Sequence, residues 1–554
     1  MNMIWISGRL LVAGFVLLGV ALSLGWHSSA NSVSDSLENE SRFYQETGTA
    51  LPLANQAKQE KDPVAGSLDD DKLDPETLVK DWEKPDFALF VTGRQHGYME
   101  PCGCITLERQ KGGLMRRHRV QTTLQERGWD LVSIDAGNQV RRCFAQQPVI
   151  KFAKTAFGLC RVMNYDMIGL GPDDLKLPAL DVAQQIDNVS VSKNPFTCAN
   201  VVVIDQMFSN RFVVINRGGK RIGVTMVVGD EHREKFDKNP DEIQVIPADQ
   251  GLQEVVPQMR AAKCDFNVLV AFAGLKQCRD FAKKHSLFNL VVTAGGAGDP
   301  TMEPELIESN THVTPMIQVG VKGMYVGLVG VYQANGKTKI KYKRVPLTHK
   351  FTDTEPMKEV FLSYQKELKN LWLTGALKDI TPREHPTGYS FVGSAACADC
   401  HDEEYAIWED GVDGDGGPHI EATDSLKENP NDDRVWVQRH YDPECMSCHA
   451  TGWNPQNFYP YKTGLVDVKA QEHLYGNGCE NCHGPGSAHV EMEEAAAKGP
   501  VDQDQLAAMR KQMVVTLEQA RSNACKECHD LDNSPDFLVE GGFDRYWPKI
   551  EHGD

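Results

Sequence analysis

The sequence lacks an excess of positive charge. Its 554 residues hold 58 Lys and Arg against 77 Asp and Glu, a formal net charge of −19 at pH 7. Nucleic-acid-binding proteins need a basic face for phosphate groups, so this balance argues against that class of function. A net negative charge suits docking with basic protein partners instead.

Long apolar runs are also lacking, except at the N-terminus. Residues 10–25 form a run of about sixteen mostly apolar residues behind Arg9. This pattern is typical of a secretory signal, with a cleavage site at residues 28–30. The alternative for residues 1–30 is an uncleaved anchor, which would add membrane association, because counting from Met3 brings the run close to spanning length. Both interpretations place the rest of the chain outside the cytoplasm.

Residues 31–85 show no regular spacing of apolar residues and are rich in Ser, Glu, Gln, Asp and Lys. Such a composition buries too little apolar surface to fold, and we predict a flexible linker. The remaining chain is too long for one hydrophobic core, so at least two further domains are expected.

Residues 86–348 show a different pattern, in which short apolar runs alternate with segments of helical periodicity. The runs begin at Phe87, Leu131, Met167, Val201, Phe212, Ile222, Asn267, Leu290 and Met324. Runs of this length predict buried strands. The helical segments include residues 113–126 and 252–263. The alternation predicts an α/β domain with two sheets, followed by a helical linker over residues 349–388 that Pro382 and Pro386 end.

From residue 389 strand signals vanish and one pattern, C-x-x-C-H, occurs four times. Its cysteines are Cys397, Cys400, Cys445, Cys448, Cys479, Cys482, Cys525 and Cys528, and the histidines that follow are His401, His449, His483 and His529. Two thiols at this spacing form thioethers to one porphyrin, and the adjacent His offers a nitrogen to its iron. Structural zinc is the alternative, but zinc does not require a His after every pair. We therefore predict four covalently bound haem c groups in a mainly α/loop domain over residues 389–554.

Seven cysteines lie outside this pattern. They are Cys102, Cys104, Cys143, Cys160, Cys198, Cys264 and Cys278. In an oxidising compartment the default expectation is disulfides, and the odd number leaves at least one thiol unpaired. A second hypothesis is a metal or redox site built from Cys102, Cys104 and His96.

Residues 391–554 resemble the tetrahaem cytochrome c554 family. The residues that carry the resemblance are 391–397 before the first pair, then Tyr405 and Trp408, 442–453 around the second pair, 478–489 around the third, and 533–537 and 546–552 after the fourth. The resemblance implies a periplasmic electron carrier with closely stacked haems and redox partner proteins. It favours His419, His489 and His552 as second axial ligands, from a pool that also holds His385, His440 and His473.

One departure from that family lies between Trp408 and His419. Residues 410–417 form an acidic, Gly-rich insertion that lacks the full ligand series of a calcium loop. Our working hypothesis is three bis-His haems and one with an open or different sixth site. The methionines that could replace His are Met446, Met492, Met509 and Met513, and Met ligation would raise the potential.

The α/β segment resembles the calcineurin-like metallophosphatases of the periplasmic 5′-nucleotidase type. The resemblance rests on residues 91–97, 112–117, 135–138 and 165–174, in that order. It implies a dinuclear metal centre formed by loops at the strand ends.

Most ligands of such a centre are absent. Arg94 stands at the position of the first Asp, Asn138 replaces the second, residues 171–174 lack the Asn and His of the third loop, and Phe272 and residues 294–298 replace the remaining histidines. A two-metal phosphatase needs anionic and imidazole ligands to activate water. We predict that the fold is kept and phosphatase chemistry is lost. A single metal on Asp135, Asn138, Asp173 and His96 is the alternative.

The sequence as a whole predicts an exported tetrahaem cytochrome for periplasmic electron transfer, not an enzyme. The competing hypotheses are a haem-based reductase or oxidase of a small nitrogen or sulfur compound, and an active metal-dependent phosphoesterase in the α/β domain.

Overall fold

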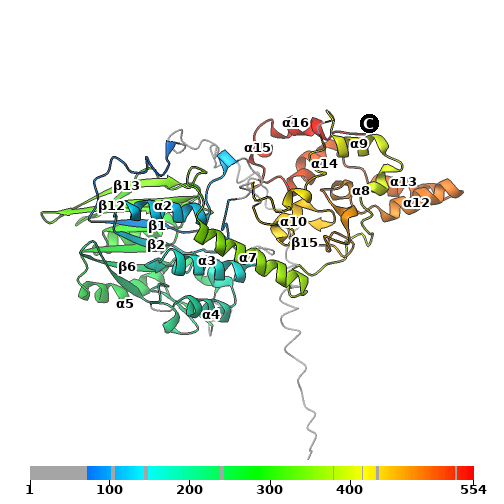
Figure 1. The fold of residues 1–554 in the computed structure, drawn as a ribbon. Helices are drawn as coiled ribbons and strands as arrows, with labels where there is room; N and C mark the ends of the chain where they lie inside the picture. Colours follow the sequence, from blue (N-terminus) through cyan, green and yellow to red (C-terminus); the bar gives the residue numbers. More distant parts are fainter. Residues whose placement is uncertain are drawn as a thin grey trace, which may run out of the picture. The chain divides into compact units, whose positions relative to one another are not determined.

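The computed structural model describes residues 72–101, 107–141, 147–190, 193–236, 242–377, 380–414, 416–431, 436–530 and 533–553 (Figure 1). The predicted signal or anchor over residues 1–30 and most of the predicted linker lie outside these ranges. In the part of the chain that the structure describes, no helix is both long and apolar enough to span a membrane.

The α/β region contains two mixed sheets, as predicted, and in addition a two-stranded antiparallel ribbon of β4 and β7. The strands are β1 (Phe87–Thr92), β2 (Leu131–Asp135), β3 (Met167–Ile168), β4 (Val201–Val203), β5 (Phe212–Arg217), β6 (Lys220–Val228), β7 (Ile243–Val245), β8 (Phe266–Phe272), β9 (Leu290–Thr293), β10 (Glu305–Glu308), β11 (Val313–Gln318), β12 (Tyr325–Ala334) and β13 (Lys337–Pro346). The first sheet has the order β13-β12-β1-β2-β3 and the second β10-β11-β9-β8-β6-β5. In each sheet the central pairs, β1 with β2 and β8 with β9, are parallel. The pairs β12 with β13, β10 with β11 and β5 with β6 are antiparallel.

The two sheets share one apolar core. Phe87 of β1 packs edge-on against Phe266 of β8, with ring centroids 5.6 Å apart. The helices of this region are α2 (Leu114–Glu126), α3 (Pro148–Phe157), α4 (Ala179–Val189), α5 (Ala248–Ala261), α6 (Leu275–Lys284) and α7 (Glu355–Leu373). Helices α2, α3, α4 and α7 contribute to the shared core, whereas α5 and α6 bury a second cluster on the other face of the second sheet.

The predicted flexible linker is wrong at its C-terminal end. Leu78 and Val79 are buried in the shared core, and Trp82 stacks on Trp129. The apolar side chains in this stretch are few, but they pack against the α/β region.

β13 forms one edge of the first sheet. Lys337, Lys339, Lys341 and Lys343 alternate along it. β3, at the opposite edge, is two residues long.

The region after residue 389 consists of short helices and loops, as predicted. The helices are α8 (Ser394–Ala398), α9 (Asp402–Asp410), α10 (Pro443–His449), α11 (Cys479–His483), α12 (Ser487–Lys498), α13 (Gln503–Gln512), α14 (Leu517–Ser522), α15 (Pro535–Leu538) and α16 (Gly542–Tyr546), with a 3₁₀ turn, η11 (Ala524–Glu527). One two-stranded ribbon pairs β14 (Trp453–Asn454) with β15 (Tyr459–Pro460). Its apolar clusters are small compared with those of the α/β region.

Candidate haem-binding region

Each C-x-x-C-H motif begins on or beside a helical turn. The turns are α8, α10, α11 and η11. Residues three and four apart lie on the same face of a helical turn. Both cysteines and the His of each motif can therefore face one planar group.

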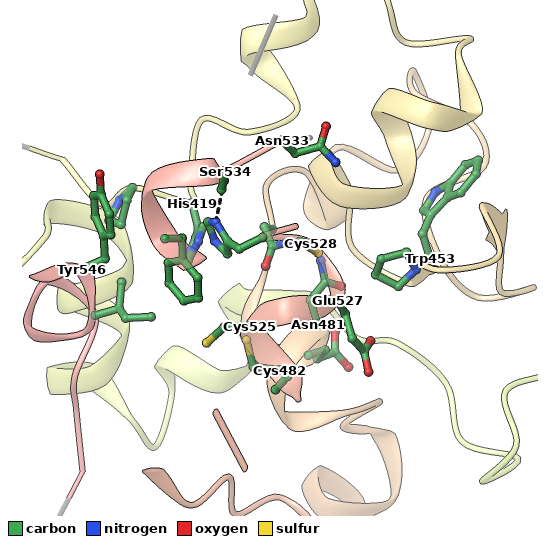
Figure 2. A pocket seen from close by; sticks show the side chains of 18 of the residues that line it. His419, Trp453, Asn481, Cys482, Cys525, Glu527, Cys528, Asn533, Ser534 and Tyr546 are labelled. Atoms are coloured by element: carbon green, nitrogen blue, oxygen red, sulfur yellow. Dashed lines mark hydrogen bonds between the residues drawn. The ribbon is translucent and has the colours of Figure 1, made fainter. Parts of the chain in front are cut away.

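Three of the four motif histidines have a hydrogen bond at Nδ1. His449 Nδ1 lies 2.8 Å from the carbonyl oxygen of Ala422, and His483 Nδ1 lies 2.6 Å from that of Met513. A carbonyl oxygen only accepts, so Nδ1 carries the proton and Nε2 keeps its lone pair. The hydroxyl of Ser534 lies 2.9 Å from His529 Nδ1 (Figure 2). Metal-bound histidines are held in this way, with the second nitrogen bound to protein.

The three histidines predicted as second axial ligands each lie opposite a motif histidine. The ring centroids are 6.4 Å apart for His401 and His489, 6.2 Å for His529 and His419, and 5.8 Å for His483 and His552. A metal–nitrogen bond is about 2 Å long, which places a metal roughly 3 Å from the centre of an imidazole ring. Facing rings about 6 Å apart therefore fit one metal ion between them. The sequence named these residues but not which histidine each would face.

His449 is the exception among the four. In the described part of the chain, no imidazole is paired with it as in the other three sites; His419, whose pKa is lowered by burial and then by the charges of His529 and His449, is paired with His529. The nearby His440 is buried, and its Nε2 donates to the carbonyl of Thr423 at 2.9 Å while Nδ1 contacts Gln438. Both nitrogens of His440 are thus engaged with protein. The site at His449 is the one that fits an open sixth position.

The side chains of two further candidates for an axial position contact protein instead. His385 packs against Tyr461, with centroids 4.6 Å apart, and its Nδ1 contacts Thr387. Met446 is buried in the small core of this region.

The motifs adjoin one another in pairs. The side chain of Cys397 lies next to that of Cys479, and the side chain of Cys448 next to that of Cys528. The first motif therefore lies beside the third, and the second beside the fourth.

Glu480, a residue between the cysteines of the third motif, connects it to the approach to the first. Its buried carboxylate accepts hydrogen bonds from the backbone N–H groups of Val392, Gly393 and Gly486, at 2.7–3.0 Å. Burial raises the pKa of Glu480, although these donors oppose the rise. Sequence reasoning missed this residue, because nothing in the C-x-x-C-H pattern distinguishes the two residues between the cysteines.

A cavity of about 450 Å³ lies at the third and fourth motifs. Its lining includes His419, Cys482, Cys525, Cys528 and His529 (Figure 2). Cofactor pockets commonly have volumes of about 300–1,000 Å³. The cysteines, the facing imidazoles and the available Nε2 atoms together fit covalently attached haem.

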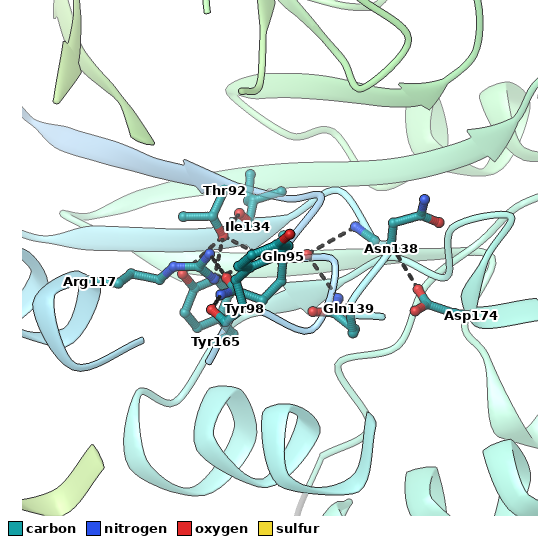
Figure 3. Close-up of polar contacts among 11 residues, drawn as sticks. Thr92, Gln95, Tyr98, Arg117, Ile134, Asn138, Gln139, Tyr165 and Asp174 are labelled. Atoms are coloured by element: carbon teal, nitrogen blue, oxygen red, sulfur yellow. Dashed lines mark hydrogen bonds and ion pairs between the residues drawn. The ribbon is translucent and has the colours of Figure 1, made fainter. Parts of the chain in front are cut away.

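Polar residues fill the strand ends of the α/β region, where the resemblance implied a metal centre. Asp135 and Arg117 form a fully buried ion pair at 3.3 Å, and Thr92 donates to the same carboxylate at 2.6 Å. Gln139 donates to its other oxygen at 2.9 Å (Figure 3), and Arg117 also bonds to Gln95. The oxygens of Asp135 are thus occupied by protein donors.

Asp173 is likewise neutralised by its neighbours. Lys176 lies 2.6 Å from one carboxylate oxygen, and the amide of Asn138 donates to the other at 2.7 Å. Arg94 donates to the carbonyl of Gly296 at 2.5 Å. Burial, followed by the charge of Arg94, lowers the pKa of His96 to about 4.

The carboxylate of Asp174 holds the loops in place. It accepts backbone N–H groups of Asn138, Val140 and Gly171 at 2.8–3.1 Å (Figure 3). Burial raises its pKa to about 8, against the effect of these donors. Within the described ranges, no group of three or more His, Cys, Asp or Glu side chains is placed to hold a metal. The hypothesis of a single metal on Asp135, Asn138, Asp173 and His96 finds its two carboxylates already paired.

The disulfide expectation is wrong for the cysteines that the structure describes in this region. Cys160, Cys198, Cys264 and Cys278 are free thiols. Cys198 and Cys278 are buried, and their thiols hydrogen-bond to Asn200 and to Ala273 at 3.4 and 3.2 Å. Each of these two thiols is thus satisfied by an oxygen close to it in the chain. Cys102, Cys104 and Cys143 lie outside the described residues, and so does the predicted site on the first two.

Comparison with known proteins supports a haem cytochrome. The family described as cytochrome c554 and c-prime matches residues 396–484. Cytochrome c-554 of Nitrosomonas europaea is 30% identical over 103 residues, which are 17% of this chain and 39% of that protein. The chain thus spans well under half of this curated relative. The resemblance to this family is confirmed over the matched segment.

Solved structures similar to this chain include a 5′-nucleotidase precursor from Thermus thermophilus, with a TM-score of 0.46 and 17% identity. That match covers 56% of this chain and 62% of the other. A calcineurin-like phosphoesterase from Bacillus subtilis gives a TM-score of 0.39 and 17% identity, covering 51% of this chain and 97% of the other.

Proposed function

We propose that this protein is an exported tetrahaem c-type cytochrome that passes electrons to and from redox partner proteins. The observation that carries the proposal is the set of three facing His pairs, each at one C-x-x-C-H motif, with a fourth motif beside them. Bound haem supplies an iron that takes up and releases single electrons.

The chain's own residues hold the attachment points close together. The side chains of Cys397 and Cys479 lie next to each other, as do those of Cys448 and Cys528, so neighbouring motifs are in contact. Glu480 fixes the third motif to the segment before the first. Short separations of this kind are what electron transfer along a chain of centres requires.

The test combines electron paramagnetic resonance of the purified, oxidised protein with mass spectrometry of the intact protein. We expect four covalently attached haems, three low-spin and one high-spin. Fewer than four haems in the mass would contradict the count, and four low-spin signals would contradict the open site at His449.

The second candidate is a reductase or oxidase of a small nitrogen or sulfur compound at His449. The absence of a facing imidazole there, among the described residues, favours it. Titration with nitrite, hydroxylamine and sulfite distinguishes the two functions. In the presence of a reductant, a carrier leaves the concentration of the added compound unchanged, whereas an enzyme consumes the compound.

We also propose that the α/β region does not hydrolyse phosphate esters. The support is that Arg117 and Lys176 occupy the carboxylates that a metal pair would need. Metal analysis combined with a phosphate-ester assay in added Mn²⁺ and Zn²⁺ tests this, and metal-dependent hydrolysis would overturn it.

Export is the remaining part of the proposal. Residues 1–30 support it through their apolar run behind Arg9. N-terminal sequencing of the protein from its native host is expected to start near residue 31 if the segment is a signal. If the segment is an anchor, the protein is expected to keep it and to appear in the membrane fraction.

A further inference from the structure

The helix that carries the motif of His449 is held by polar contacts from the α/β region. Lys151 of α3 lies 2.7 Å from the carboxylate of Glu444. Gln365 of α7 donates to Asp442 at 2.8 Å. An ion pair also joins Glu100 to Arg439.

Most side chains in these contacts are buried, whereas Glu444 is 29% exposed and Glu100 is 20% exposed. The side chains of Lys151 and Arg439 are 5% and 6% exposed. Gln365 and Asp442 are also buried. Charges removed from water in this way are costly without a partner, and their fields are weakly screened by solvent.

The contacts converge on the start of α10. Asp442 caps the helix and accepts the backbone N–H of Glu444 at 3.2 Å. Glu444 directly precedes Cys445, the first attachment residue of this motif. The pair of Lys151 and Glu444 therefore places one charge of each sign beside the haem attachment point whose motif histidine has no facing imidazole in the described chain.

We propose that Lys151 and Glu444 balance each other's charge beside the haem site at His449, so that the α/β region, through Lys151, keeps the charge of Glu444 from shifting the reduction potential there. The inference rests on the proposed haem function. A positive charge near the iron disfavours its oxidised, more positive state and raises the potential, and a negative charge lowers it. In the intact pair the two effects largely cancel.

Because the two charges have opposite effects on the potential, removing each one alone should shift it in opposite directions. K151M removes the positive charge beside Glu444 and is expected to lower the potential of this haem. E444Q removes the negative charge beside Lys151 and is expected to raise it. Each shift is expected to change the ratio of reduced to oxidised haem about tenfold at a fixed potential, which is about 59 mV for one electron. The double variant K151M/E444Q is expected to return close to the starting value.

Lys154 provides a matched control on the same helix. It lies 2.7 Å from Glu367 of α7, and its side chain is 22% exposed. K154M makes the same change of charge one turn away, at a lysine paired with α7 and not with α10. We expect it to leave the potential unchanged.

The potential is measured by spectroelectrochemical titration of the full protein at pH 8, above the usual range of carboxyl pKa values. The high-spin component reports the haem at His449. Shifts of the same sign in K151M and E444Q, or no shift in either, would overturn the proposal. K151R, which keeps the charge, should behave as the unaltered protein and covers the case in which K151M fails to fold.

Failure of the two proposals can be told apart. An unaltered protein without a high-spin component contradicts the open site at His449. In that case the titration still resolves several potentials, and the charges of Lys151 and Glu444 act on one of these haems only if its potential moves in opposite directions in the two variants.

Discussion

The α/β region and the haem region differ in what they are built from. The α/β region buries two large apolar clusters between and beside its sheets. The haem region buries ten residues in one small cluster and three in another. Residues 389–554 contain 32 Asp and Glu against 12 Lys and Arg, whereas residues 1–388 are nearly neutral, with 45 against 46. We therefore expect the α/β region to fold on its own side chains and the haem region to depend on the haem groups that it is proposed to bind.

The largest expected effect comes from withholding haem attachment. Expression in cells without the thioether-forming machinery should leave residues 389–554 without a sufficient core, while the α/β region stays folded. Limited proteolysis with mass spectrometry checks this. If residues 389–554 resisted proteolysis without haem, the two regions would not differ in their need for a bound group.

The next effect concerns the facing histidines. Replacement of His419, His489 or His552 by Ala should each convert one low-spin haem to high-spin, because the second axial nitrogen is lost. Electron paramagnetic resonance counts the change. H440A is the control, because both its ring nitrogens are bound to protein. A change of spin state in H440A would contradict the assignment.

These histidines also show how much of the site could be predicted from the sequence. The C-x-x-C-H spacing is local, so it predicted His401 and its three equivalents directly. The resemblance named His419, His489 and His552, but their partners depend on how distant segments fold together. His529 faces His419, which precedes it by 110 positions.

In the α/β region, the runs of buried residues predicted most strands but missed β7, β10, β11 and β13. β10 and β13 have exposed or half-buried faces, so their sequences lack a continuous apolar run. The loss of metal ligands was visible at Arg94 and Asn138. The partner of Asp135 was not, because Arg117 lies on a helix whose sequence gives no sign that its side chain is fully buried.

The buried pair of Arg117 and Asp135 should be important for stability. R117M or D135N leaves one buried charge without its partner, and a loss of about 3–5 kcal/mol in the free energy of unfolding is expected. Urea unfolding measures it. R279M removes a partner from the more exposed Arg279–Glu305 pair and should cost less than about 1 kcal/mol. Equal losses in the two variants would contradict the role of burial.

A smaller loss is expected at Glu480. E480Q places an amide where three backbone N–H groups need acceptors, and it should cost about 1–3 kcal/mol within the haem region. Thermal unfolding followed at the haem absorbance checks this. E491Q, at an exposed glutamate, is the control and should leave the midpoint unchanged.

The smallest effect is a pH dependence at His96. Its pKa is lowered to about 4 in the folded protein, from 6.5. The unfolded chain therefore binds more protons between these values, so the stabilising contribution is present above pH 6.5 and is lost as the pH falls towards 4. H96N suits the left-handed backbone there, with φ 55°, and should reduce that loss by on the order of 1 kcal/mol. Parallel stability curves for the two proteins across this pH interval would contradict it.

The alternating lysines of β13 have a consequence for aggregation between copies of the protein. An edge strand with open hydrogen-bonding groups is a template to which another chain can add, with aggregation as the result. Lys337, Lys339, Lys341 and Lys343 place a row of like charges along that edge, and the opposite edge is only two residues long. A second copy approaching edge to edge would bring four more lysines against the first four. The repulsion between these two rows of lysines therefore opposes the addition of a second copy to this edge of the sheet.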